Sequence, residues 1–305
     1  MSKLDFLRKY LRLHAKKAFR FIAMMPHRRN DTLAREFENF LSIIAIAKNE
    51  GAYFKEWIDF HLAVGIEKFY IYDNESSDNT REILQPYIDR GIVVYHDFPG
   101  PKMQRPAYQH AIKNYKYKTR WMALLDLDEF LVPATANSVP AVIKDIAGDN
   151  KHISQILIGW RIYGSSGHRE KPNGMVIENY LHHEKPHNGK YWHKAIFNPR
   201  RVYIVECHCC GVFGKTIDEN GAPIPMPHNV DVFTVPESCY ISTNKIRINH
   251  YAVKSWDEWI AKKYKGDAWK KRGQIKSDAY FTQYDQNDIF DDAMQKWVDL
   301  IRDEQ

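Results

Sequence analysis

The chain of 305 residues contains four cysteines, Cys207, Cys209, Cys210 and Cys239, too few to staple a protein of this length with disulfides. Such sparse use fits a reducing compartment. Cys207 and Cys210 form a CxxC pair, but a structural zinc site normally draws its ligands from two separated pairs, and Cys239 is the one distant thiol. We interpret most of these cysteines as small packing residues, with zinc binding as the alternative.

The sequence also lacks a membrane-spanning apolar run, an internal repeat and a low-complexity tract. It has no Walker-type glycine loop, and this absence argues against P-loop chemistry. A signal peptide is not expected, because Lys16, Lys17 and Arg20 interrupt the apolar positions and residues 21–25 (FIAMM) are too few to cross a bilayer. We therefore expect a cytoplasmic protein. The net charge of +6 comes without an RNA-binding or helix-turn-helix motif, so nucleic acid is not an expected partner.

Acidic residues are nearly absent from residues 1–30, where Asp5 stands against nine lysines and arginines. Apolar residues recur every three or four positions from Leu4 to Ile22, so a helix here would carry an apolar stripe beside a basic face. Helices of this type lie on anionic lipid; the alternatives are packing on a protein surface and a solvated tail. We expect residues 1–35 to form a basic leader that places the protein at the inner face of a membrane.

Strand-like and helix-like segments alternate through the first half of the chain. The apolar runs lie at residues 40–47, 68–72, 92–95 and 121–125, and the helical patterns at 53–64, 80–90 and 107–115. Pro86 is expected to shorten or bend the second helix. This alternation predicts a parallel sheet with right-handed crossovers and helices on both faces, and such sheets bind ligands beyond the carboxyl ends of their strands.

The second half of the chain has a different pattern. Short strand-like runs lie at residues 155–159, 203–205 and 230–235, separated by many glycines, prolines and histidines. Periodic apolar positions predict helices at residues 256–265 and 288–302. We expect this loop-rich half to complete a cleft on the parallel sheet rather than to fold alone.

Residues 124–130 (LLDLDEF) place Asp126, Asp128 and Glu129 at the end of the fourth predicted strand. Because side chains alternate along a strand, Asp126 and Asp128 are expected to share one side while Leu127 faces the core. Neighbouring carboxylates repel unless one is protonated or a cation lies between them. A divalent ion such as Mn²⁺ or Mg²⁺, held by carboxylates, phosphate oxygens and water, is a common way to bind a nucleoside diphosphate. The D-x-D pattern alone is common and usually marks a solvated turn. The interpretation as a metal site therefore depends on the position of the motif at the end of a strand.

Several motifs agree in their order along the chain with those of known enzymes. They are AIAKNE (45–50), EWIDFH (56–61), FYIYDNESSD (69–78), LDLDEF (125–130), GWRIYGSSGH (159–168), HKAIF (193–197) and NHYAVKS (249–255). Together they resemble the family 2-like and family 92 (DUF23-type) glycosyltransferases over about residues 40–270, while residues 207–227 match no motif. The resemblance implies an α/β GT-A fold, with a Rossmann-like, mostly parallel sheet and a mixed acceptor-side half. It places the catalytic domain at residues 36–270 and a helical extension at 271–305.

The same resemblance implies a metal-dependent transfer, usually with inversion, from a nucleotide sugar to a glycan or glycolipid. The family usually uses a UDP-sugar, with galactose frequent. Combined with the basic leader, it predicts a role in lipopolysaccharide or other surface polysaccharide synthesis. The alternative is a nucleotide-sugar hydrolase or a nucleotidyl or phosphoryl transferase that uses the same acidic metal site.

The resemblance assigns the metal to Asp126 and Asp128, with His250 as a candidate further ligand; the alternative for His250 is a structural histidine bonded to backbone. For the residues expected to bind the donor, the alternative roles are turn formation, helix capping and plain surface exposure. These donor-site candidates are Lys48, Asn49, Glu50, Asp73, Asn74, Gln104, Asp126 and Lys194.

An inverting displacement needs one general base on the acceptor hydroxyl, and the candidates are Glu178 and Glu129, ahead of Glu184. Trp160 and Tyr163 are the aromatic platforms expected for an acceptor sugar, and His168 is expected to bond its hydroxyls. Core packing accounts for an aromatic residue equally well, so this alternative stays open.

Overall fold

The computed structural model describes residues 36–186, 192–225, 241–265 and 276–303. The basic leader, the strand predicted at 230–235 and Cys239 lie outside these ranges. Among the helices that the structure describes, none has both the length and the apolarity needed to span a membrane.

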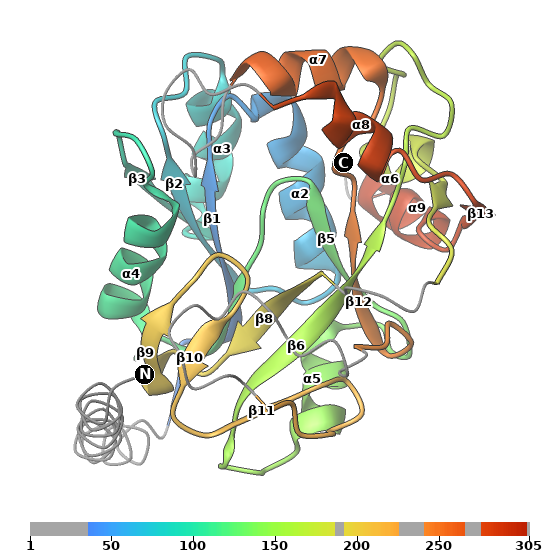
Figure 1. Cartoon of the computed structure of the whole chain (residues 1–305). Coiled ribbons are helices and arrows are strands. Elements are labelled where there is room, and N and C mark those ends of the chain that lie inside the picture. The colour runs from blue at the N-terminus through green and yellow to red at the C-terminus, as the bar shows by residue number, and fades with distance from the viewer. Residues whose placement is uncertain (1–35, 187–191, 226–240, 266–275, 304–305) are drawn as a thin grey trace, which may run out of the picture.

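A nine-stranded sheet forms the centre of the described part of the chain, in the order β3-β2-β1-β4-β8-β6-β12-β5, with β11 beside β6 (Figure 1). Its strands are β1 (Asn39–Ala47), β2 (Lys68–Asp73), β3 (Val93–Asp97), β4 (Thr119–Leu124), β5 (Glu129–Pro133), β6 (Ile153–Ile162), β8 (His193–Phe197), β11 (Lys215–Ile217) and β12 (Ile246–His250). The first four strands are mutually parallel, as predicted. The expected α/β, GT-A type sheet is thereby confirmed.

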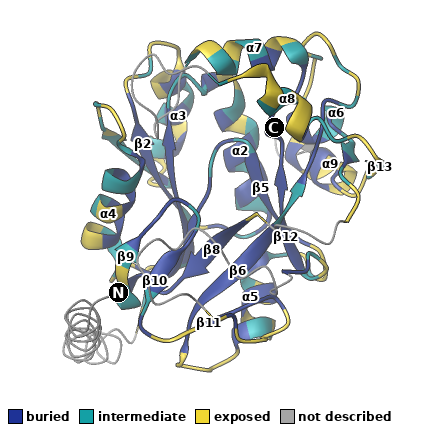
Figure 2. Ribbon diagram, viewed as in Figure 1, coloured by how far each residue is buried: buried dark blue, intermediate teal, exposed yellow. Residues whose placement is uncertain are grey.

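Both faces of β1 are buried, which explains its nearly continuous apolar sequence. Ile43 and Ala45 belong to the core cluster that includes side chains of α2 (Gly51–Ala63) and α3 (Thr80–Asp89). Ile44 and Ile46 belong to a second cluster, with side chains of α4 (Gln104–Tyr115). Figure 2 shows the strands buried and the outer faces of these helices partly exposed.

The three predicted helices of the first half are confirmed, each within a few residues of its expected bounds. Pro86 lies inside α3, which nevertheless continues to Asp89. Because the strands joined by these helices are parallel, the loops after β1, β2 and β4 lie at the same end of the sheet.

Three strands of the second half, β8, β6 and β12, enter the sheet between β4 and β5. β8 lies antiparallel between β4 and β6, and β12 lies parallel to β6 and antiparallel to β5. The register pairs His250 of β12 with Glu129 of β5, which brings two motifs far apart in the sequence to one place.

The remaining elements surround this sheet. They are α5 (Val139–Ala147), α6 (Val176–Asn179), β7 (His182–His183), η1 (Pro199–Arg201), β9 (Val202–Val205), β10 (Cys210–Val212), α7 (Trp256–Lys265), α8 (Asp278–Tyr284), β13 (Ile289–Phe290) and α9 (Gln295–Asp303).

The prediction of one helix over 288–302 is wrong at its start, because residues 289–290 pair with β7 and the helix begins at Gln295. The Asp291 carboxylate anchors this segment, accepting bonds from Arg161 (2.9 Å) and the Tyr163 hydroxyl (2.8 Å).

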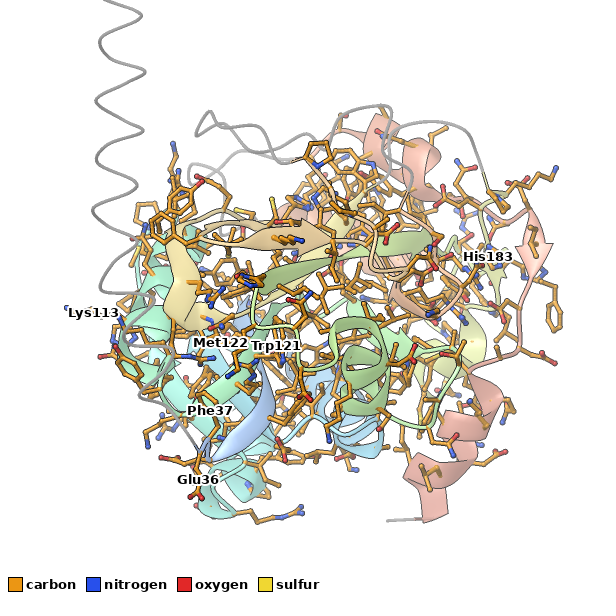
Figure 3. All side chains as sticks on the ribbon, turned by 90° about the horizontal axis from the view of Figure 1, so that it is seen from below. Glu36, Phe37, Lys113, Trp121, Met122 and His183 are labelled. Carbon is orange, nitrogen blue, oxygen red and sulfur yellow. The ribbon has the colours of Figure 1, made fainter. Side chains whose placement is uncertain are left out.

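At the opposite end of the sheet from the acidic turn, Arg200 closes the core. Its buried guanidinium donates to the carbonyls of Lys116 (2.9 Å) and Thr119 (2.7 Å) and lies over the Phe37 ring. Figure 3 looks onto this end of the sheet and labels Phe37 and Trp121. His183, whose strand pairs with β13, is labelled at the opposite side of the picture. The functional loops therefore lie away from where the described chain begins.

Glu219 fixes the start of β12. Its carboxylate is 1% exposed and accepts bonds from the backbone N–H groups of Asn244 (2.8 Å), Lys245 (2.8 Å) and Ile246 (3.0 Å), and from the Ser242 hydroxyl. Because β12 carries His250, this carboxylate also supports the placement of that histidine.

We predict that Glu219→Ala lowers the free energy of unfolding by roughly 3 kcal/mol, since it leaves several buried donors without an acceptor. Urea unfolding followed by circular dichroism measures the change. The exposed Glu170→Ala is the matched control and should unfold like the wild type. A loss below about 1 kcal/mol in Glu219→Ala would contradict this role.

Glu56 links α2 to α6 by accepting from the backbone N–H groups of Val176 (2.8 Å) and Ile177 (2.9 Å). Burial raises the pKa of Glu56 to about 7 from 4.5, although these two bonds act in the opposite direction. The folded protein thus holds this proton more tightly than the unfolded chain does. The contribution of Glu56 to the unfolding free energy therefore falls as the pH rises from about 4.5 to about 7.

We predict that Glu56→Gln reduces the loss of stability between about pH 5 and pH 8 by roughly 2 kcal/mol, because the variant has no proton to release there. Urea unfolding at both pH values tests this, with the exposed Glu82→Gln as control. Equal pH dependence in Glu56→Gln and the wild type would show that the proton is not held more tightly on folding.

Candidate active site

A cavity of about 680 Å³ lies where the ends of β1 and β4 meet residues of β6, β8, β12, α7 and α8. We call it the central cavity. The residues that line it are Ile46, Ala47, Lys48, Glu50, Gln104, Asp126, Leu127, Asp128, Trp160, Trp192, Lys194, Cys207, His208, His250, Lys262, Lys265, Lys276, Ser277, Tyr280 and Tyr284. The position agrees with the prediction of a ligand site beyond the strand ends.

The acidic motif does not continue β4 as an extended strand. The strand ends at Leu124, and the backbone N–H of Glu129 donates to the Asp126 carbonyl (3.1 Å) across a tight turn. Strand alternation is therefore the wrong cause, but the predicted outcome is found: Asp126 and Asp128 both line the central cavity, and Leu127 belongs to the core cluster that includes α2 and α3. The turn is stabilised because its charged side chains find partners on other elements.

Asp126 lies between two donors from different elements. Its carboxylate accepts from Lys194 Nζ on β8 (2.8 Å) and from Gln104 Nε2 at the start of α4 (3.2 Å). The side chain remains 36% exposed. Asp126 therefore stays accessible to a ligand while it is held in place.

Glu129 lies behind this pair and is fully buried. Its Oε2 accepts from the backbone N–H of Asp126 (2.9 Å) and lies 3.4 Å from Lys194 Nζ. Burial raises the pKa of Glu129 well above its usual range, although Lys194 acts in the opposite direction. Burial would lower the pKa of Lys194, but Asp126 and Glu129 hold it well above its usual value. Glu129 thus supports the turn and does not itself line the cavity.

Asp128 contacts two cationic or basic groups. Lys262 Nζ from α7 forms an ion pair with its Oδ2, and His250 Nε2 lies 3.6 Å from the same oxygen. Burial would raise the pKa of Asp128, but Lys262 and His250 outweigh it and hold the pKa well below its usual range. Asp128 is therefore a carboxylate anion in the folded protein.

His250 is buried beside the acidic turn, as the resemblance implies. Its ring lies over Trp160, with the centroids 4.2 Å apart, and its Nδ1 has no hydrogen-bond partner among the described residues. Burial lowers the pKa of His250, while Asp128 acts to raise it. Nε2, which lies 3.6 Å from Asp128 Oδ2, is the nitrogen that a metal ion shared with this carboxylate would use, and a neutral imidazole is a suitable donor for it.

The donor-site candidates divide into two groups. Lys48, Glu50, Gln104, Asp126 and Lys194 line the central cavity. Asn49, Asp73 and Asn74 do not line it, since their side chains bond neighbouring loops. Asn49 accepts from Ser77 N (2.7 Å), Asp73 from Ser76 N (2.8 Å) and Tyr95 (2.7 Å), and Asn74 donates to the Phe98 and Gly100 carbonyls (2.9 Å each). The turn-forming alternative describes these contacts, and a donor-binding role for them stays a prediction.

Aromatic residues form one wall of the cavity. Trp160 on β6 and Trp192 stack with their centroids 5.8 Å apart, and His208 lies 5.4 Å from Trp160. Trp192 is 40% exposed, so its ring is available to a ligand. Burial, together with Lys194, lowers the pKa of His208 to about 3, which leaves the imidazole neutral.

Three other predicted residues lie off the cavity wall. Tyr163 is buried and bonds Asp291, while the ring of His168 lies 3.3 Å from the Asn179 carbonyl. Glu178 is paired with Arg302 Nη2 at 2.6 Å. Their roles toward the acceptor and as general base therefore remain predictions without support from the cavity lining.

Several lining residues could not be predicted from the sequence, namely Trp192, Lys262, Lys265, Lys276, Tyr280 and Tyr284. Lys262 and Lys265 share one face of α7 at a spacing of three, but lysines in the last turn of a helix usually face solvent. Tyr280 stacks on Trp259 of α7 with the centroids 5.1 Å apart, which joins α8 to this wall. These contacts depend on tertiary packing, so the sequence offered no specific signal for them.

The donor set suits a hard divalent cation. Within the described ranges no three His, Cys, Asp or Glu side chains converge into a complete metal cage. An ion shared between the protein and substrate phosphates needs one or two carboxylates, however, and Asp128 with His250 supplies a carboxylate and an imidazole at one point. By contrast, Cys207, Cys209 and Cys210 are buried thiols whose pKa values burial raises, as expected for packing residues.

Relatives were found in plants. A glycosyltransferase family 92 protein of Ricinus communis is 23% identical over 232 residues, which cover 74% of this chain and 37% of that protein. A galactan beta-1,4-galactosyltransferase of Arabidopsis thaliana is 22% identical over 175 residues, covering 53% of this chain and 35% of that protein. The chain thus spans little more than a third of the length of these curated relatives.

Solved structures give weaker likenesses. S. aureus TarS in complex with UDP has a TM-score of 0.32 and 13% identity, over 47% of this chain and 40% of that one. Glucosyl-3-phosphoglycerate synthase from Mycobacterium tuberculosis, solved with Mn²⁺ and UDP, has a TM-score of 0.27 and 18% identity, over 40% of this chain and 44% of that one. Scores this low add nothing to the sheet topology described above.

The family model described as glycosyltransferase family 92 matches residues 41–287. This span contains the acidic turn, β8 with Lys194, β12 with His250, and both helices that close the central cavity. Because the match covers most of the sequence and the whole of the cavity, the chain belongs to glycosyltransferase family 92.

Proposed function

We propose that the chain is a metal-dependent glycosyltransferase that moves a hexosyl group from a nucleoside-diphosphate sugar to a glycan or glycolipid hydroxyl. The charge of the central cavity carries this proposal. Its lining contains Lys48, Lys194, Lys262, Lys265 and Lys276, and against them Glu50, Asp126 and Asp128. The lysines outnumber the carboxylates of the lining, so the cavity suits an anion such as a diphosphate.

UDP-galactose is the donor that we propose. The family resemblance implies a UDP-sugar with galactose frequent, and a relative of this chain is named as a galactan galactosyltransferase. The aromatic wall formed by Trp160 and Trp192 suits the apolar face of a sugar ring, so we place the acceptor there. Lys194 and Gln104 hold Asp126 toward the donor.

Asp128 and His250, with Asp126 nearby, are the residues that would hold Mn²⁺ or Mg²⁺. When bound, such an ion neutralises the charge that develops on a departing diphosphate. For the transfer itself we propose inversion, as the family resemblance implies, with one general base on the acceptor hydroxyl. Glu129 and Glu178 are retained as predicted bases, although neither lines the central cavity.

We further propose that the acceptor belongs to a lipopolysaccharide or other surface polysaccharide precursor. The support is the basic, periodic composition of residues 1–35, which suits the anionic surface of the inner membrane. A nucleotide-sugar hydrolase or a nucleotidyl or phosphoryl transferase would use the same acids. A two-metal reaction of that kind needs more carboxylates than the three that line the cavity in the described ranges.

Removing either motif carboxylate should abolish transfer. We predict that Asp126→Ala and Asp128→Ala each reduce formation of galactosylated product from UDP-galactose by on the order of 100-fold or more, because each loses an electrostatic contact to the donor complex. Chromatography of products made from galactan oligosaccharide or glycolipid acceptors measures the rate.

The exposed Asp149→Ala is the control for these variants, and their melting temperatures should confirm an intact fold. Full activity of both motif variants in the presence of EDTA would exclude the metal mechanism. Release of free sugar or phosphate in place of a new glycosidic bond would favour the hydrolase or phosphoryl transferase.

We expect Trp192 to contact the acceptor and not the donor. We predict that Trp192→Ala raises KM for the acceptor about tenfold while KM for UDP-galactose stays unchanged, because a stacking contact is lost. Initial-rate kinetics with each substrate varied in turn measures both constants, and Trp192→Phe should recover most of the loss. Tyr117→Ala, at an exposed aromatic outside the cavity, serves as control. An equal rise in both KM values would refute an acceptor-specific role.

A further inference from the structure

Two lysines on one face of helix α7, Lys262 and Lys265, line the central cavity. Lys262 Nζ is paired with the Asp128 carboxylate and donates to the Ala252 carbonyl (2.7 Å). Lys265 Nζ is paired with the Glu50 carboxylate. Lys263, between them, turns away from the cavity and bonds Asp278 Oδ1 of α8 (2.7 Å). The helix therefore presents alternate lysines to two different environments.

The surroundings of Lys262 leave it available to a ligand. Its side chain is 19% exposed and lines the cavity. An ammonium group has three N–H donors, and the hydrogen bonds to Asp128 and Ala252 use two of them. Phosphate oxygens in the cavity can accept from the third N–H and, in place of Asp128, from the N–H that now donates to Asp128, without loss of the Ala252 contact.

Lys262 also occupies the carboxylate that would hold a metal ion. It contacts Asp128 Oδ2, the same oxygen that lies 3.6 Å from His250 Nε2. A divalent cation on Asp128 and an ammonium on the same oxygen repel each other. Phosphate oxygens relieve this conflict, because they accept bonds from the ammonium and also bind the cation.

We propose that Lys262 is a diphosphate-binding residue that competes with the metal ion for Asp128, so that metal binding depends on the nucleotide. This inference rests on the proposed function and extends it to the order in which the ligands bind. Without nucleotide, Lys262 neutralises Asp128 and weakens metal binding. With a nucleoside diphosphate, Lys262 bonds the phosphate and releases Asp128. The metal and the nucleotide thus strengthen each other's binding by the same factor.

Lys265 contributes to the same phosphate-binding face without the competition. Its partner is Glu50, which follows β1, and not Asp128; both Lys265 and Glu50 line the cavity. We expect Lys265 to add to nucleotide affinity and to leave metal affinity unchanged.

The test measures two affinities on the full chain. Mn²⁺ binding to the nucleotide-free protein is followed by electron paramagnetic resonance, and UDP binding at saturating Mn²⁺ by calorimetry. Lys262→Met should tighten Mn²⁺ binding about tenfold and weaken UDP binding about tenfold, two shifts of opposite sign. Lys265→Met should weaken UDP binding and leave Mn²⁺ binding unchanged. The matched control Lys263→Met should change neither affinity.

Lys262→Gln keeps a polar side chain and should shift both affinities in the same directions as Lys262→Met, which preserves the test if the methionine variant folds poorly. Unchanged affinities in the Lys262 variants, or weaker binding of both ligands, would overturn the inference. In that case, binding of UDP by the wild type would still support the proposed function. Failure of the wild type to bind UDP with Mn²⁺ would overturn both.

Discussion

The structure depends on the neutralisation of an acidic turn by lysines from distant elements. Asp126, Asp128 and Glu129 lie within four residues of each other, and the last of them is fully buried. Such a cluster repels itself unless cations are placed among the carboxylates. Lys194 pairs with Asp126 and Glu129, and Lys262 pairs with Asp128, so the turn keeps a fixed geometry.

This requirement explains why the second half of the chain enters the sheet. β8 must lie next to β4 for Lys194 to reach the turn, and β12 must pair with β5 for His250 to stand opposite Glu129. Glu219 secures the start of β12, and α7 follows that strand with Lys262. The halves of the chain are therefore joined through the site itself as well as through apolar packing.

The same cations determine which ligand the cavity suits. More lysines surround it than its own carboxylates neutralise, so an anion completes the charge balance. Beside these charged residues, Trp160 and Trp192 offer an uncharged surface on which a ring can stack. A charged surface next to an aromatic one fits the proposed placement of a nucleotide-sugar donor and a glycan acceptor.

Local patterns in the sequence were sufficient to predict the parallel half of the sheet, its helices and the position of the acidic motif at its edge. These features follow from the apolar periodicity of neighbouring residues and from the way parallel strands share one end. Resemblance alone pointed to His250. The pairing of Asp128 with Lys262, 134 residues away, and the start of α9 at Gln295 were decided by tertiary structure. An ion pair or a strand pairing between distant segments leaves no periodic signal, because it depends on how the sheet brings those segments together.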